Sequence, residues 1–158
     1  MKYHMSLAVG TMALVCLGAT SSAFAQSLKD KVVGAYILES GSENYADGKS
    51  LHSWATGNLI LDATGHFSDF LIGKDRAKTS ESVRAPVGPA VAFYGTYSVD
   101  EAASTINLKI ESGVTPVFDG AARSWKISLK GDIMTATSPE TKTPEGMMTP
   151  VNEWKRLK

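Results

Sequence analysis

Cysteine is almost absent from the sequence. The single Cys16 lies in an apolar stretch near the start of the chain, at residues 5–20. Lys2 precedes this stretch and an Ala-Phe-Ala triplet ending at Ala25 follows it, which is the order of a secretory signal peptide. The stretch is shorter than the roughly 20 apolar residues of a spanning helix. Val15, just before the cysteine, is not the small residue that a lipoprotein site needs.

We therefore expect cleavage after Ala25, with residues 1–25 as the signal peptide and residues 26–158 as one mature domain. That length is sufficient to bury a core. Cleavage removes Cys16, so the mature domain is expected to have no disulfide, no thiolate nucleophile and no cysteine metal ligand. The expected location is periplasmic or secreted.

An excess of charge is also missing. The chain has 16 Lys and Arg against 16 Asp and Glu, and loss of Lys2 with the signal leaves a formal charge of −1. Without a basic stripe we expect no nucleic-acid partner. No stretch after the signal is long and apolar enough to span a membrane. The sequence leaves the oligomeric state open.

Residue sets for metal or nucleophilic chemistry are scarce as well. The mature domain holds only His52 and His66, which lie far apart and in or near predicted turns, whereas a metal site needs several converging ligands. Neither a G-x-S-x-G nucleophile turn nor a phosphate-binding glycine loop is present. We expect no metal and no cofactor.

Strand patterns cover most of the mature domain. In residues 105–111, Ile106, Leu108 and Ile110 alternate with polar residues, which is the period of a strand with one wet face. In residues 123–130, Trp125, Ile127 and Leu129 share a face in the same way. Six more strands are predicted at residues 33–39, 54–62, 66–72, 91–99, 133–137 and 149–157. A short helical turn capped by Ser27 is expected to open the domain.

Eight short-linked strands predict an all-β fold, a single antiparallel up-and-down eight-stranded barrel. Closure removes exposed strand edges; an open sandwich is the alternative. The interior of such a barrel is either filled by side chains or holds one small ligand. Residues 73–89 form a long break in the pattern, either a lid over the opening or an insertion without a function.

Several segments in order resemble the bacterial and fungal lipocalin-like domain. They are residues 33–38 (VGAYIL), 57–60 (GNLI), 64–67 (TGHF), 93–100 (FYGTYSVD), 129–132 (LKGD) and 153–156 (EWKR). The resemblance implies a lipocalin-type barrel, whereas a fold transfers function poorly. It further implies that Gly34 and Tyr36 pack with Arg156 and close one end, through a cation–π contact.

This chain departs from the family pattern at three positions. Tyr36 stands where tryptophan is usual, and Arg123 and Trp125 stand where the family favours glutamine and arginine. A catalytic role shared with the family is therefore not expected for these residues.

The candidate ligand-binding residues are mainly aromatic, because small-molecule pockets are lined by apolar walls with few polar groups. They are Trp54, Phe70, Phe93, Tyr97 and Trp125, together with Arg123. Arg123 is expected either to clamp a carboxylate near the opening or to lie at the rim with its head in water. The alternative for the rings is that they fill the barrel and leave no cavity.

Asp69 has two possible orientations, because Phe67 and Leu71 share its parity while Phe70 has the opposite one. Facing inward, its pKa is raised and it suits acid–base chemistry; facing outward, it is an ordinary solvated carboxylate. Three functions stay open: a carrier for a small hydrophobic molecule, a barrel enzyme that isomerises or cyclises such a molecule, or a non-catalytic interaction module.

Overall fold

The computed structural model describes residues 26–74, 76 and 88–158. The expected signal peptide, residues 1–25, lies outside the described residues. So does most of the expected lid, residues 75 and 77–87. Those expectations stay predictions.

A one-turn helix, α1 (Leu28–Val32), opens the domain as predicted. Ser27 caps it, and its hydroxyl accepts a hydrogen bond from the Asp30 backbone N–H at 3.1 Å. Ten strands and a 3₁₀ turn follow. They are β1 (Gly34–Tyr45), β2 (Ser50–Leu51), β3 (Trp54–Leu61), β4 (His66–Gly73), β5 (Ala90–Asp100), β6 (Thr105–Gly113), η1 (Pro116–Phe118), β7 (Ala122–Lys130), β8 (Ile133–Thr137), β9 (Thr141–Thr143) and β10 (Gly146–Arg156).

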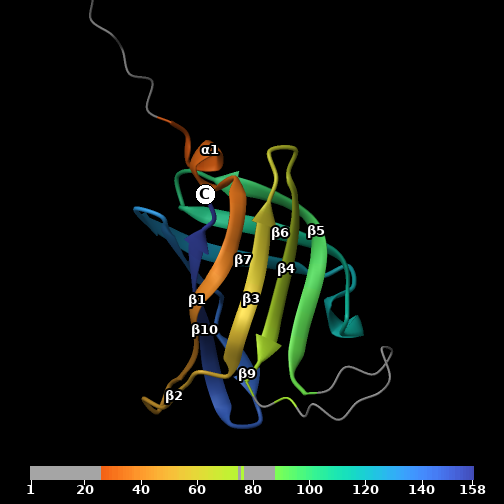
Figure 1. The fold of residues 1–158 in the computed structure, drawn as a ribbon. Helices are drawn as coiled ribbons and strands as arrows, with labels where there is room; N and C mark the ends of the chain where they lie inside the picture. Colours follow the sequence, from red (N-terminus) through yellow and green to blue (C-terminus); the bar gives the residue numbers. More distant parts are fainter. Residues whose placement is uncertain (1–25, 75, 77–87) are drawn as a thin grey trace, which may run out of the picture.

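The strands form one closed antiparallel barrel, which confirms the predicted fold (Figure 1). Neighbours follow the order β1, β3, β4, β5, β6, β7, β8, β10, and β10 pairs back with β1 to close the ring. The short β2 and β9 extend β1 and β10 at one end. Helix α1 lies at the opposite end (Figure 1). We call these the open end and the closed end.

Strand β1 is longer than predicted. Residues 40–44, a polar run beyond the strand predicted at residues 33–39, continue the strand to Tyr45 after a bulge between Leu38 and Ser40. The reason is pairing across the sheet, because Ser40 to Tyr45 lie opposite Glu153 to Met148 of β10. Such pairing satisfies the backbone groups of a polar segment as well as those of an apolar one.

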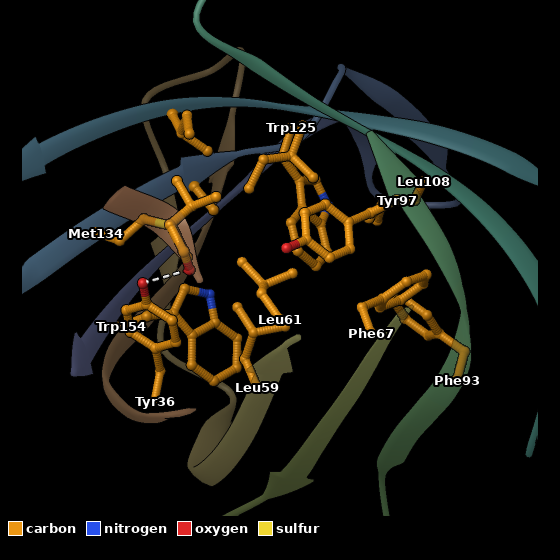
Figure 2. Close-up of a cluster of buried hydrophobic side chains, with 14 of the residues drawn as sticks. Tyr36, Leu59, Leu61, Phe67, Phe93, Tyr97, Leu108, Trp125, Met134 and Trp154 are labelled. Atoms are coloured by element: carbon orange, nitrogen blue, oxygen red, sulfur yellow. Dashed lines mark hydrogen bonds between the residues drawn. The ribbon is translucent and has the colours of Figure 1, made fainter. Parts of the chain in front are cut away.

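The inward faces of all the main strands meet in a single core. Ile106, Leu108 and Ile110 from β6 pack in the same cluster as Trp125 and Ile127 from β7, as their alternation predicts. Figure 2 shows the inner part of this cluster, where Leu59, Leu61 and Trp154 converge between Tyr36 and Tyr97. The interior is therefore filled at this level.

Tyr36 and Arg156 close the barrel beside α1, as the lipocalin resemblance implies. The Arg156 guanidinium carbon lies 4.8 Å from the centre of the Tyr36 ring. Its Nη2 donates to the Tyr36 hydroxyl at 2.6 Å, and the guanidinium also donates to the carbonyls of Val33 and Lys31. The Tyr36 hydroxyl donates in turn to the Val32 carbonyl at 2.7 Å.

Candidate functional site

A cavity of about 250 Å³ lies inside the barrel at the open end. We call it the open-end cavity. Its lining comes from eight elements and from the segment after β8, namely Glu43, Trp54, Asp69, Leu71, Val91, Phe93, Phe118, Arg123, Trp125, Ser138, Thr141, Met148, Pro150 and Asn152. The interior between the two ends is filled, and a second pocket of about 290 Å³, lined in part by Asp30, Tyr36, Met134 and Arg156, lies at the closed end beside α1.

The alternation of each strand explains why these side chains meet. On β4, Asp69 and Leu71 share the inward face with Phe67. On β5, Val91 and Phe93 lie opposite Leu71 and Asp69 across the ladder. Because successive side chains of a strand point to opposite faces, the same rows that fill the core also line the cavity further along.

Four of the six candidate ligand-binding residues line this cavity. Phe93 and Trp125 are buried, and Trp54 is half-buried at the start of β3. Arg123 lies at the rim with its side chain exposed, and its guanidinium carbon is 4.7 Å from the centre of the Phe118 ring. Phe118 also packs on Phe93, with ring centres 5.1 Å apart. These rings form one side of the opening.

The other two candidates lie elsewhere. Phe70 is 45% exposed on the outer face of β4, so the expectation that it lines the interior needs correction. It borders a shallow outer groove of about 350 Å³ with Tyr94 and Val114. Tyr97 points inward but lies in the filled core, where its hydroxyl donates to the Asp62 carbonyl at 2.6 Å. Burial raises the pKa of the Tyr97 hydroxyl.

Asp69 is the most unusual group in the open-end cavity. Its side chain faces inward and is only 3% exposed. Its Oδ1 has no hydrogen-bond partner within the described part of the chain, whereas buried polar atoms are normally paired. Loss of hydration raises the pKa of this carboxyl to about 7, although a hydrogen bond from the Phe70 backbone opposes the rise. At neutral pH it therefore holds a proton part of the time.

Three charged side chains line the cavity in the described residues: Glu43, Asp69 and Arg123. Glu43 is half-buried on β1, and its carboxylate accepts a hydrogen bond from the Ser53 hydroxyl at 3.4 Å. Two of the three are thus acidic and at least half-buried, while the one cation lies at the exposed rim. An acid–base role for Asp69 stays a prediction.

Several lining residues were not among the sequence candidates. Met148, Pro150 and Asn152 share the parity of the buried Trp154 on β10, so their alternation with that residue was the available signal. Phe118 lies in η1, between two strands, and no periodicity marks a side chain in such a turn.

The described residues contain no group of three metal-ligating side chains. Within the same residues, no helix has the length and apolar character needed to cross a membrane.

Comparisons with known proteins add little to this description. No protein-family model matches the chain, and no curated protein matches it. A lipocalin-like protein from Bacteroides uniformis ATCC 8492 is similar in structure, with 17% identity and a TM-score of 0.44 over 79% of this chain and 97% of that one. An uncharacterized protein from Bacteroides eggerthii DSM 20697 has 17% identity and a TM-score of 0.43 over 79% and 98%. The fold assignment rests on the strand order of the barrel itself.

Proposed function

We propose that the protein binds and carries a small, mostly apolar molecule in the open-end cavity. The observation that supports this is a hollow lined by Trp54, Phe93 and Trp125 above a filled core. Small-molecule sites are typically about 300–1,000 Å³ with apolar walls and few polar groups, so the volume of about 250 Å³ suits a small ligand that partly protrudes. Burial of apolar surface supplies about 25 cal/mol per Å² toward binding.

Binding is tested with a panel of fatty acids, isoprenoids and aromatic metabolites, measured by calorimetry and by the shift in melting temperature. Val91→Trp places a large ring in the open-end cavity and is expected to weaken binding at least tenfold. Ser98→Trp adds the same ring on the exposed outer face of the same strand and should leave binding unchanged. Absence of binding by every class of compound would overturn the proposal.

We further propose that the protein is exported, because its first residues have the order of a cleaved signal peptide. The expected result is a mature chain that begins at Gln26 in the periplasmic or secreted fraction. N-terminal sequencing of protein purified from its host checks this. A chain that retains residues 1–25 in the cytoplasm would contradict it.

An acid–base enzyme is the second candidate, and the buried Asp69 is the observation that favours it. A carboxyl with a pKa near neutrality in an apolar site suits proton transfer. If a bound ligand is processed, incubation in deuterated water should place deuterium on its carbon skeleton with the native protein. The Asp69→Asn variant should then bind the ligand and exchange nothing. Absence of exchange by the native protein would remove this candidate.

A further inference from the structure

The free acceptor in the open-end cavity defines what kind of ligand would complete it. Asp69 is the only charged side chain that is buried among the described residues. Asp69 lines the open-end cavity, and no donor of the described residues reaches its Oδ1. An unpaired acceptor at this depth is costly, and a donor brought by a ligand removes that cost. A ligand that completes Asp69 therefore brings a hydrogen-bond donor.

The charges around Asp69 favour a cation over an anion. Glu43 on β1 lines the same cavity and has the same sign as the Asp69 carboxylate. Arg123 on β7 is the one cation of the described lining, but it is exposed at the rim and lies over the Phe118 ring. Water screens an exposed charge far more than a buried one. The deep part of the cavity is therefore acidic.

Aromatic walls add to this preference. The indoles of Trp54 and Trp125 and the Phe93 ring border the space beside Asp69. Ring faces attract cations, and a desolvated site strengthens the attraction. The same rings also accept an apolar or aromatic body by simple burial.

We infer that the open-end cavity takes a primary amine on a small apolar body, with its ammonium group donating to the free Oδ1 of Asp69. This inference rests on the proposed function, whose ligand class it narrows. The ammonium supplies the missing donor, and the carboxylate neutralises the ligand's charge in a site with little water. The apolar body then lies against the aromatic walls.

The inference has a consequence for pH. The ammonium pairs with the ionised form of Asp69, and the pKa of that carboxyl in the free protein is about 7. Apparent affinity scales with the fraction of protein in the competent form. The affinity for an amine should therefore rise about tenfold from pH 6 to pH 8, because the ionised fraction rises by that factor. Glu43 and Arg123 are the other charged groups facing this space in the described residues.

The test compares three probes of one shape by calorimetry at pH 6, 7 and 8: 4-phenylbutylamine, 4-phenylbutan-1-ol and 4-phenylbutyrate. At pH 8 the native protein should bind the amine at least tenfold more tightly than the alcohol, and the carboxylate most weakly. Asp69→Asn should make the amine and the alcohol equal and abolish the pH dependence. Asp132→Asn, an exposed position at the closed end paired with Lys158, should behave like the native protein.

The possible failures are distinguishable. Equal binding of amine and alcohol by the native protein, unchanged by Asp69→Asn, would overturn this inference while the proposed function stands. Binding of none of the three probes would overturn this inference, and absence of binding across the wider panel as well would overturn both. Retained alcohol binding by Asp69→Asn would show that the variant is folded and its cavity intact, so a loss of amine preference would then support the role of the carboxylate.

Discussion

At the scale of single residues, Asp69 makes the stability of the protein depend on pH. Its pKa is raised from 3.8 to about 7 in the fold because burial disfavours the charged form. Between these values the folded state holds a proton that the unfolded state has lost, so stability falls as pH rises. It reaches a lower plateau above pH 7. The slope in this window is about 1.4 kcal/mol per pH unit.

Asp69→Asn removes this slope. The free energy of unfolding of the variant should therefore rise relative to that of the native protein by about 1.4 kcal/mol per pH unit between pH 5 and pH 6.5. Urea denaturation of both proteins at several pH values measures the difference. Other titrating groups cancel in the comparison because both proteins contain them. If the difference in the free energy of unfolding stays constant over this range, folding does not raise the pKa of the Asp69 carboxyl.

Arg156 is the second residue with a measurable role. Its planar guanidinium contacts the Tyr36 ring and donates to that residue's hydroxyl and to the Val33 and Lys31 carbonyls. Lysine cannot reproduce this fork. Arg156→Lys should therefore lower the free energy of unfolding by about 1–3 kcal/mol.

The control for Arg156→Lys is Lys155→Gln on the same strand. Lys155 is exposed and forms a 3.9 Å ion pair with Glu39, and such surface pairs contribute little. Its replacement should change stability by less than about 0.5 kcal/mol. Equal losses for the two variants in chemical denaturation would contradict a special role for Arg156.

Sequence patterns predict residue roles only where the alternation is clean. Ile106, Leu108 and Ile110 alternate with polar neighbours, and all three are buried. Around Asp69 both parities contain phenylalanine, so the sequence permits either face inward. Only the pairing of β4 with β5, which sets Asp69 opposite Phe93, decides that Phe70 faces out. That information is not local to the segment.

At the scale of elements, Gly95 allows two strands to approach at a bulge. The register of β5 and β6 shifts between Tyr94 and Gly95, so that Glu111 is the extra residue. A Cβ on Gly95 would overlap the Lys109 carbonyl oxygen and lie 3.0 Å from the Ile110 Cα. A glycine inside a strand is typical of such a bulge, where another backbone approaches closely.

Gly95→Ala should therefore cost more than 2 kcal/mol of stability, since backbone atoms of β6 must move. Gly120→Ala is the comparison, because Gly120 has a positive φ of 72° with nothing within 4 Å of an added Cβ. Gly120→Ala should lower stability only by the cost of a side chain at a left-handed backbone position, about 1 kcal/mol. Thermal unfolding of both variants checks the order, and a reversal would contradict the close approach.

Element boundaries were predicted less well than element identities. All eight main strands lie where alternation places them, but β1 extends beyond its apolar part to Tyr45, and β9 lies between the strands predicted at residues 133–137 and 149–157. Both segments are polar and owe their strand conformation to pairing with β10. A pattern of hydrophobic residues has no signal for such pairing.

At the scale of the whole molecule, the filled core and the open-end cavity should respond differently to truncation of a side chain. Leu61 lies in the filled core with 1% of its side chain exposed, so Leu61→Ala should cost about 2–5 kcal/mol. Val91 is half-buried beside the open-end cavity. Val91→Ala should cost about 1 kcal/mol or less, because it removes fewer packed contacts. Equal costs per methyl group would indicate a uniformly filled barrel.

The barrel could be predicted from the sequence, whereas its hollow could not. Eight amphipathic strands in antiparallel order predict closure, since closure pairs every edge. Whether the interior is filled depends on summed side-chain volumes at each level along the axis. The sequence placed rings such as Tyr97 and Trp125 inside, but not that Tyr97 would lie in the filled core and Trp125 beside a cavity.

The most direct test of a ligand-accepting hollow uses the three indole N–H signals in a nitrogen-15 NMR spectrum. Trp54 and Trp125 line the open-end cavity, while Trp154 lies fully buried in the filled core (Figure 2). Titration with 4-phenylbutan-1-ol should shift the first two signals and leave the third in place. Unchanged indole signals, with shifts centred on Phe70 and Tyr94 of the outer face, would contradict the account.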